Sequence, residues 1–147
     1  MILIENFLKE LEQEAQTTRK MLSRIPDDQF SWKPHLKSMD IKALATHIAE
    51  LPTWVGMALK TEGLDFATSP YSPVDVNTTA GLLDYLESSL ADARKNLESA
   101  NDEDLKPEWT LRTGDDPCAR QREPQPPARS QAVRLPRAYQ GTRLILQ

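Results

Sequence analysis

The sequence is poor in the residues that metal and disulfide sites most often use. One cysteine and two histidines occur among 147 residues. The single cysteine, Cys118, excludes an intramolecular disulfide, which is usual for a protein of the reducing cytoplasm. Long hydrophobic runs are also missing, and no segment approaches the roughly 20 apolar residues of a transmembrane helix. We therefore expect a soluble, cytoplasmic protein that has no membrane partner.

Glycine is scarce as well. The five glycines are isolated from one another, so the sequence contains no glycine-rich loop that could bind phosphate. Two histidines leave almost no choice of a catalytic base, and no Ser/His/Asp arrangement is indicated.

Charge divides the chain into two unequal parts. Residues 1–116 carry 12 basic and 21 acidic residues, whereas residues 117–147 carry six arginines and one acid and hold five of the 11 prolines. We predict a helical domain at 1–114. We interpret 115–147 as a basic tail that is either disordered or the product of a shifted reading frame near residues 114–117. Arginines can bind nucleic-acid phosphates, but the acidic body argues against such a partner.

Three segments of the first part have the apolar spacing of amphipathic helices. The first stripe consists of Ile4, Leu8, Leu11, Ala15, Thr18, Leu22 and Ile25, and Pro26 ends it. The second helix is predicted from Met39 to Lys60, capped by Ser38 and ended by Gly63, with a kink or break at Pro52. Its stripe consists of Ile41, Leu44, Ala45, Ile48, Leu51, Val55 and Leu59.

The third helix is predicted to be capped by Asn77 or Thr78. Its stripe consists of Leu82, Leu86, Leu90, Ala93, Leu97 and Ala100. No segment shows a strand pattern, so the chain is predicted to be an all-α bundle.

Chemistry could come from His47, on the flank of the second stripe, with Glu50 one turn further on. These two side chains would give a metal ion only two ligands, whereas zinc or nickel needs three or four. The alternative is a hydrogen-bonded histidine at the edge of the core. His35 is interpreted as a surface or packing residue. Cys118 is not expected to be a catalytic thiol.

The segment Leu44-Ala45-Thr46-His47-Ile48-Ala49-Glu50-Leu51-Pro52 resembles the DinB-like (YfiT-like) family of metalloenzymes. Trp32-Lys33-Pro34-His35 before it and Glu108-Trp109-Thr110-Leu111-Arg112 after the third helix extend the resemblance to about residues 1–114. The resemblance implies an up-down-down-up four-helix bundle, often dimeric, with nickel or zinc on three histidines. His47 matches the first metal ligand. The other two come from a fourth helix, and this chain has no histidine after His47.

The sequence therefore predicts a DinB-type bundle whose fourth helix is missing or degraded and whose three-histidine metal site is incomplete. One interpretation is a scaffold of metal-dependent transferases or hydrolases, inactive as written. The alternative is a non-catalytic helical module that dimerises or binds a partner through its exposed stripes. We expect a homodimer, because a lost fourth helix would leave part of each stripe uncovered.

Overall fold

A computed structural model of the chain describes residues 2–69, 72–114 and the backbone of 135–136. The helices are α1 (Ile2–Leu22), α2 (Ile41–Glu50), α3 (Thr53–Lys60) and α4 (Thr79–Ser99), with short 3-10 turns at Asp27–Gln29 and Asp102–Leu105. The strands are β1 (Gly63–Asp65), β2 (Glu108–Arg112) and β3 (Leu135–Pro136). The predicted all-α bundle is confirmed. The tail predicted at 115–147 lies outside the described residues, except for the backbone of β3, and the domain boundary after residue 114 stays a prediction.

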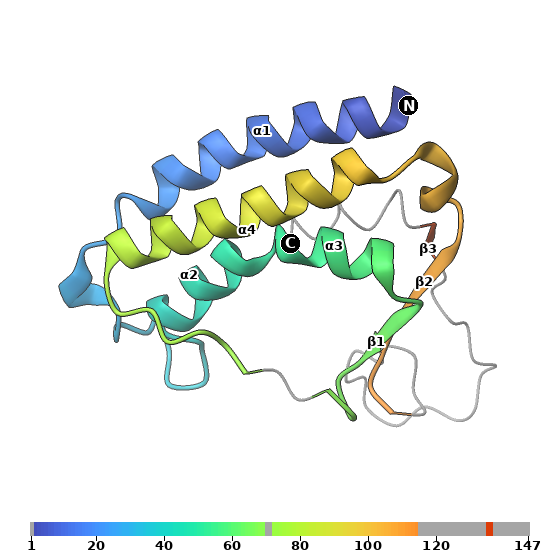
Figure 1. Cartoon of the computed structure of the whole chain (residues 1–147). Coiled ribbons are helices and arrows are strands. Elements are labelled where there is room, and N and C mark those ends of the chain that lie inside the picture. Colours follow the sequence, from blue (N-terminus) through green and yellow to red (C-terminus); the bar gives the residue numbers. More distant parts are fainter. Residues whose placement is uncertain (1, 70–71, 115–134, 137–147) are drawn as a thin grey trace.

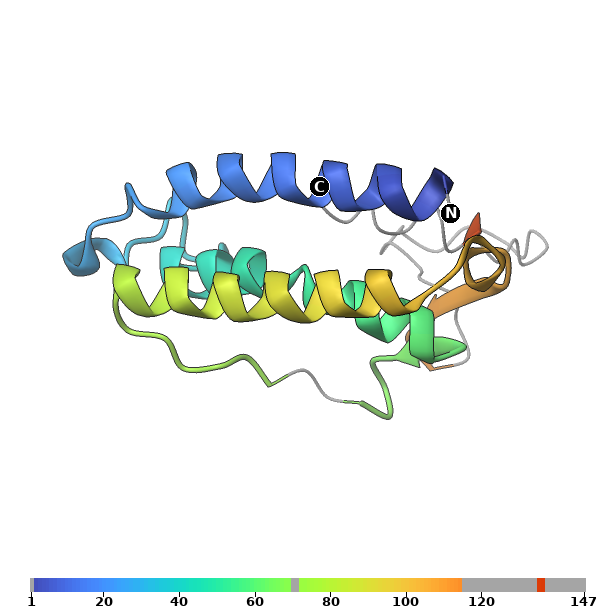
Figure 2. The same ribbon diagram turned by 45° about the horizontal axis from the view of Figure 1, so that its top comes forward.

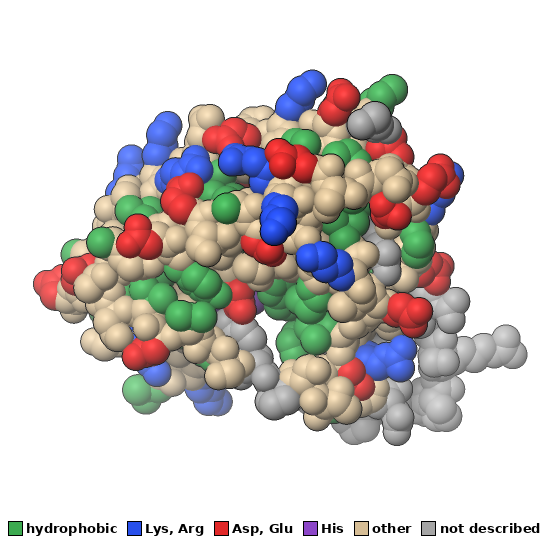
Figure 3. Space-filling view, in the orientation of Figure 1, with side chains coloured by type: hydrophobic (Ala, Val, Ile, Leu, Met, Phe, Trp, Pro, Cys, Tyr) green, Lys and Arg blue, Asp and Glu red, His purple; other side chains and the backbone are tan. Residues whose placement is uncertain are grey.

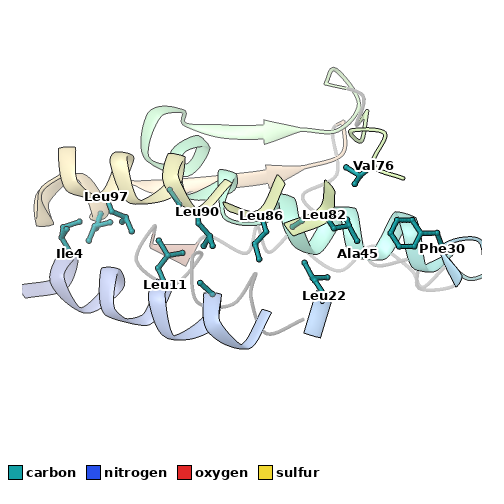
Figure 4. Close-up of a cluster of buried hydrophobic side chains, with 14 residues drawn as sticks. Ile4, Leu11, Leu22, Phe30, Ala45, Val76, Leu82, Leu86, Leu90 and Leu97 are labelled. Atoms are coloured by element: carbon teal, nitrogen blue, oxygen red, sulfur yellow. The ribbon is translucent and has the colours of Figure 1, made fainter. Parts of the chain in front are cut away.

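Helix α4 lies at the centre of the bundle. Helix α1 runs antiparallel along one side of it, and α2 and α3 run parallel to it on another side (Figures 1 and 2). Thr78 begins the helix as its N-cap, because its Oγ1 accepts a hydrogen bond from the backbone N–H of Gly81 at 3.0 Å. The predicted stripe of α4 is buried as expected against side chains of α1 (Figure 4), its buried members being Leu82, Leu86, Leu90, Ala93 and Leu97.

Helix α2 packs on α4 in a different way from the prediction. The residues of α2 that are buried are small: Ala45, Thr46 and Ala49. Of the predicted stripe only Ala45 is buried, and Leu44 is 49 % exposed. The predicted stripe is therefore covered only in part. Ile48 is half-buried and packs against the core, whereas Leu44 is exposed.

The predicted break at Pro52 is confirmed. Helix α2 ends at Glu50, and Pro52 precedes α3. The predicted N-cap was wrong. Asp40 rather than Ser38 is the N-cap of α2, since its carboxylate accepts the N–H of Ala43 at 2.7 Å. The predicted end at Lys60 is confirmed as the end of α3, but Gly63 lies in a strand and does not end the helix.

The first helix ends earlier than its apolar stripe. Helix α1 stops at Leu22. The N–H of Ile25 then bonds to the Leu22 carbonyl at 3.1 Å, which makes a tight turn before Pro26. Proline disfavours helical geometry in the residue before it, so the turn cannot continue as a helix.

A small sheet crosses the end of the bundle, which corrects the prediction of no strands. Strands β1 and β2 are parallel, with Gly63 opposite Thr110, and β3 pairs antiparallel with β2. A Cβ at Gly63 would lie 2.4 Å from the Thr110 carbonyl oxygen, so only glycine allows this approach. The Trp109 indole is buried and donates to Thr61 Oγ1 at 3.0 Å. The sheet ties the end of α3 to the segment after α4.

The outer surface over α1 and α4 carries interspersed acidic and basic side chains (Figure 3). Arg19 pairs with Glu87, and Arg94 pairs with Glu12 at 2.6 Å, each pair joining α1 to α4. In the part of the chain that the structure describes, no helix is long and apolar enough to cross a membrane.

Candidate functional site

An open groove separates α1 from α2. Its volume is about 540 Å³. Both helices pack on α4, and α4 supplies Leu86 and Leu90 to the groove. The lining is mostly apolar, but it includes the carboxylate of Glu14 on α1 and the imidazole of His47 on α2. A groove of this size falls within the range of about 300–1,000 Å³ that is typical of ligand-binding pockets.

His47 is held at this groove by its position on α2. Its side chain is 36 % exposed, and its Nδ1 lies 3.7 Å from Oε2 of Glu50, whose side chain is 19 % exposed. The two residues are three positions apart, so they share one side of the helix. The predicted placement of His47 and Glu50 on one side of the helix is therefore present, with their side chains in long contact.

An aromatic group supports the pair. The rings of His47 and Trp54 of α3 form a T-shaped contact, with their centroids 6.1 Å apart and an interplanar angle of 78°. The ring centroid of Phe66, which directly follows β1, lies 6.4 Å from the ring centroid of Trp54. Trp54 itself is buried. His47 and Trp54 are seven positions apart, one on each side of the break at Pro52, so α2 and α3 each contribute one ring to this contact.

Helix α4 places a phenol near the same carboxylate. Burial raises the pKa of Tyr85, and the negative charge of Glu50 raises this pKa further. The phenol therefore stays protonated at neutral pH, and it can donate a hydrogen bond but does not add a negative charge.

The donor set does not fit a three-histidine metal centre. In the described ranges, 2–69 and 72–114, no three side chains of His, Cys, Asp or Glu come close enough to hold one ion. His35 lies on the exposed connection before α2, where its Nδ1 accepts the N–H of Lys37 at 3.1 Å. Cys118 lies outside the described residues. His47 and Glu50 would supply two ligands, fewer than the three or four that zinc and nickel need.

One polar atom near this site has no partner in the described part of the chain. The Oγ1 of Thr46 is buried and makes no hydrogen bond there, although the residue is 2 % exposed. Sequence reasoning did not single out Thr46 or Phe66. Thr46 belongs to the buried face of α2 together with Ala45 and Ala49. A search for large apolar residues at helical spacing does not detect this face, because all three of its residues are small.

Comparison with known proteins gives a family. The sequence matches the DinB superfamily over residues 10–130, which reaches past the predicted domain boundary at residue 114. No curated protein and no solved structure matches the chain. The match covers most of the sequence and agrees with the helical bundle described above, and the chain therefore belongs to the DinB superfamily.

Proposed function

We propose that this DinB-superfamily chain is a helical interaction module that binds an apolar segment of a partner in the groove between α1 and α2. The observation that carries the proposal is the open groove itself. Helices α1 and α2 both pack on α4, yet apolar side chains of both line the groove between them, among them the half-exposed Leu44. Contiguous exposed apolar surface is typical of a binding site.

Two half-exposed side chains mark the rims of this groove. Met21 of α1 is 48 % exposed and Leu44 of α2 is 49 % exposed, and both line the groove. A bound apolar segment would remove these side chains from water, at a gain of about 25 cal/mol for each Å² of apolar surface. Glu14 and His47 would then select polar groups at the edges of the partner segment.

Binding of an apolar fluorescent dye, anilinonaphthalene sulfonate, tests the proposal. Thr18 lines the groove, whereas Gln16 is an exposed residue of the same helix outside the lining. We expect Thr18→Trp to fill the groove and to weaken dye binding by about tenfold or more, a change of about 1.4 kcal/mol in binding free energy. Gln16→Trp should leave the affinity unchanged. Equal dye binding by both variants would refute the proposal.

A second candidate is the metal-dependent transferase or hydrolase scaffold with an incomplete site. It is supported by the spacing of His47 and Glu50, because the two side chains already lie on one side of α2. A nickel or zinc ion would supply Lewis-acid activation of water or of a thiol. The described residues do not complete its ligand set, so any further ligand must come from another chain or from residues outside the described ranges.

Metal analysis separates the two candidates. The purified protein is dialysed against nickel or zinc, and the bound metal is measured by mass spectrometry. The metal scaffold predicts one ion per chain that is lost in His47→Ala but kept in His35→Ala. The interaction module predicts substoichiometric metal that responds equally to both substitutions.

A further inference from the structure

The α1–α2 groove contains a carboxylate among apolar side chains. Among the residues that the structure describes, its lining includes one acid, Glu14, and no lysine or arginine. Glu14 is half-buried, and within 2–69 and 72–114 it makes no ion pair. Glu12 on the same helix differs, because its carboxylate pairs with Arg19 at 3.6 Å and with Arg94 at 2.6 Å. A positive group of a bound partner can therefore pair with Glu14 without displacing a basic residue of the described chain.

The basic side chains of α1 lie outside this groove. None of its three basic residues belongs to the lining, and Arg19 instead donates to Glu87 of α4 at 3.0 Å. The opposite rim, on α2, also has a carboxylate close by, since Glu50 lies 3.7 Å from the groove-lining His47. Carboxylates thus stand at or beside both rims, which favours a positively charged group in a bound partner.

The charge of the whole helical part has the same sign as the charge of the groove. Residues 1–116 carry 12 basic and 21 acidic residues. Such an excess of acids attracts basic partners over a distance and slows the approach of acidic ones. The local charge and the overall charge therefore select the same kind of partner.

The shape of the groove suits a helix. Its lining runs along α1 from Leu11 to Met21 and along α2 from Leu44 to Pro52, and the buried Leu11 and Leu90 form its floor (Figure 4). The α1 wall is about 15 Å long at 1.5 Å per residue, which is about three helical turns. Both walls are helices with internally bonded backbones, so they offer no edge to an extended strand. Apolar grooves of this kind take the apolar face of an amphipathic helix.

We propose that the partner segment is a basic amphipathic helix of about three turns, whose apolar face fills the α1–α2 groove and whose lysine or arginine pairs with Glu14. This inference rests on the proposed function, since it gives the chemistry of the segment bound in the same groove. Apolar side chains of the helix contact Leu44, Ile48 and Leu90, and a basic side chain at the edge of its apolar face reaches the Glu14 carboxylate. An acidic helix of the same shape meets like charge there.

Binding of two matched synthetic helices tests the charge of the partner. Both fluorescein-labelled peptides have leucines at the same positions, and their charged positions carry either lysine or glutamate throughout. In fluorescence anisotropy, we expect the parent protein to bind the lysine peptide about tenfold or more tightly than the glutamate peptide, and we expect added salt to reduce this preference. Equal affinities, a preference for the glutamate peptide, or no binding of either peptide would overturn the proposal.

Two variants of α1 locate the ion pair. Glu14→Gln should weaken binding of the lysine peptide by about threefold and strengthen binding of the glutamate peptide by a similar factor, as expected for a partly exposed pair. Glu12→Gln removes the same charge outside the groove lining and should change both affinities by less than about twofold, because solvent screens it. A misfolded variant would lose both peptides, so the opposite signs identify an effect of charge. Equal effects of the two substitutions would overturn the pairing with Glu14.

The anionic dye used for the proposed function separates the two levels of the proposal. Glu14→Gln should bind this dye more tightly than the parent protein does, and unchanged or weaker binding would contradict the role of Glu14. If the parent binds both peptides equally while Thr18→Trp still weakens dye binding, the basic partner fails and the groove keeps its binding function. If Thr18→Trp leaves dye binding intact, the binding function of the groove fails as well.

Discussion

Helices α2 and α4 have similar apolar stripes in sequence but different surroundings in the structure. The large residues of the α4 stripe are at most 4 % exposed. Those of α2 are half-buried or exposed: Ile48 packs against the core but is only partly buried, and Leu44 is 49 % exposed. Periodicity therefore identifies an apolar face, but it does not say whether the face is covered. The sizes of the neighbouring residues decide which side of the helix approaches its partner.

The largest expected effect comes from removing a side chain of the covered face. Leu86 is 1 % exposed, so Leu86→Ala should leave a cavity and cost about 2–5 kcal/mol of unfolding free energy. Leu44→Ala, the same change on the uncovered face, should cost less than about 1 kcal/mol. Urea denaturation measures both. Similar losses at the two positions would contradict the difference between the helices.

A smaller effect is expected where α3 meets α4. A Cβ at Gly56 would lie 2.4 Å from the Asn96 amide nitrogen and 3.0 Å from its Cγ. Asn96 is buried, and its amide donates to Asp92, so it cannot move aside freely. Gly56→Ala should cost about 1–2 kcal/mol, because overpacking outweighs the roughly 1 kcal/mol gain in helix propensity.

The matched control for Gly56 removes the obstacle. In an Asn96→Ala background, Gly56→Ala should be neutral or stabilising. A loss of the same size in both backgrounds would mean that Asn96 is not the cause.

A pH-dependent effect is expected at the start of α4. Asp27 Oδ1 accepts the Thr79 N–H at 2.7 Å, and this hydrogen bond holds the pKa of Asp27 below its ordinary value. A carboxylate with a lowered pKa stabilises the fold above the unfolded-state value of about 3.9, and this stabilisation is lost as the pH falls through the folded-state pKa.

The test compares Asp27→Asn with the parent protein by thermal unfolding across pH. Asp27→Asn should be modestly less stable at pH 7, and the difference should disappear in acid. A difference that persists or grows in acid would show that the charge of Asp27 is not responsible.

The smallest effect should come from the surface ion pairs between α1 and α4. Arg19 donates to Glu87, whose side chain is 51 % exposed. Arg19→Ala should therefore cost less than about 1 kcal/mol, and added salt should reduce this cost. A larger loss that does not respond to salt would assign Arg19 a packing role instead.

The sequence predicted the parts of the fold that depend on strong local patterns. The α4 stripe, the Thr78 cap and the break at Pro52 were readable, because apolar spacing, capping residues and proline act within a few positions. Strand β1 was not readable. It has three residues and depends on a parallel partner 47 positions away, and the close approach to Thr110 requires the glycine at position 63.

The candidate site was predictable in part for a similar reason. The His47 and Glu50 pair follows from helical spacing on one element. The groove depends on how α1 and α2 are each rotated against α4, and Phe66 joins Trp54 only after the chain has turned through β1. Such contacts are set by tertiary packing, which no local pattern reports.

Methyl NMR with an apolar nitroxide probe tests the binding role of the groove most directly. We predict selective broadening of the methyl signals of Leu44 and Ile48, while those of Leu82 and Leu97 stay sharp. Uniform broadening, or protection of Leu44 and Ile48 equal to that of Leu82, would contradict an open apolar binding groove between α1 and α2.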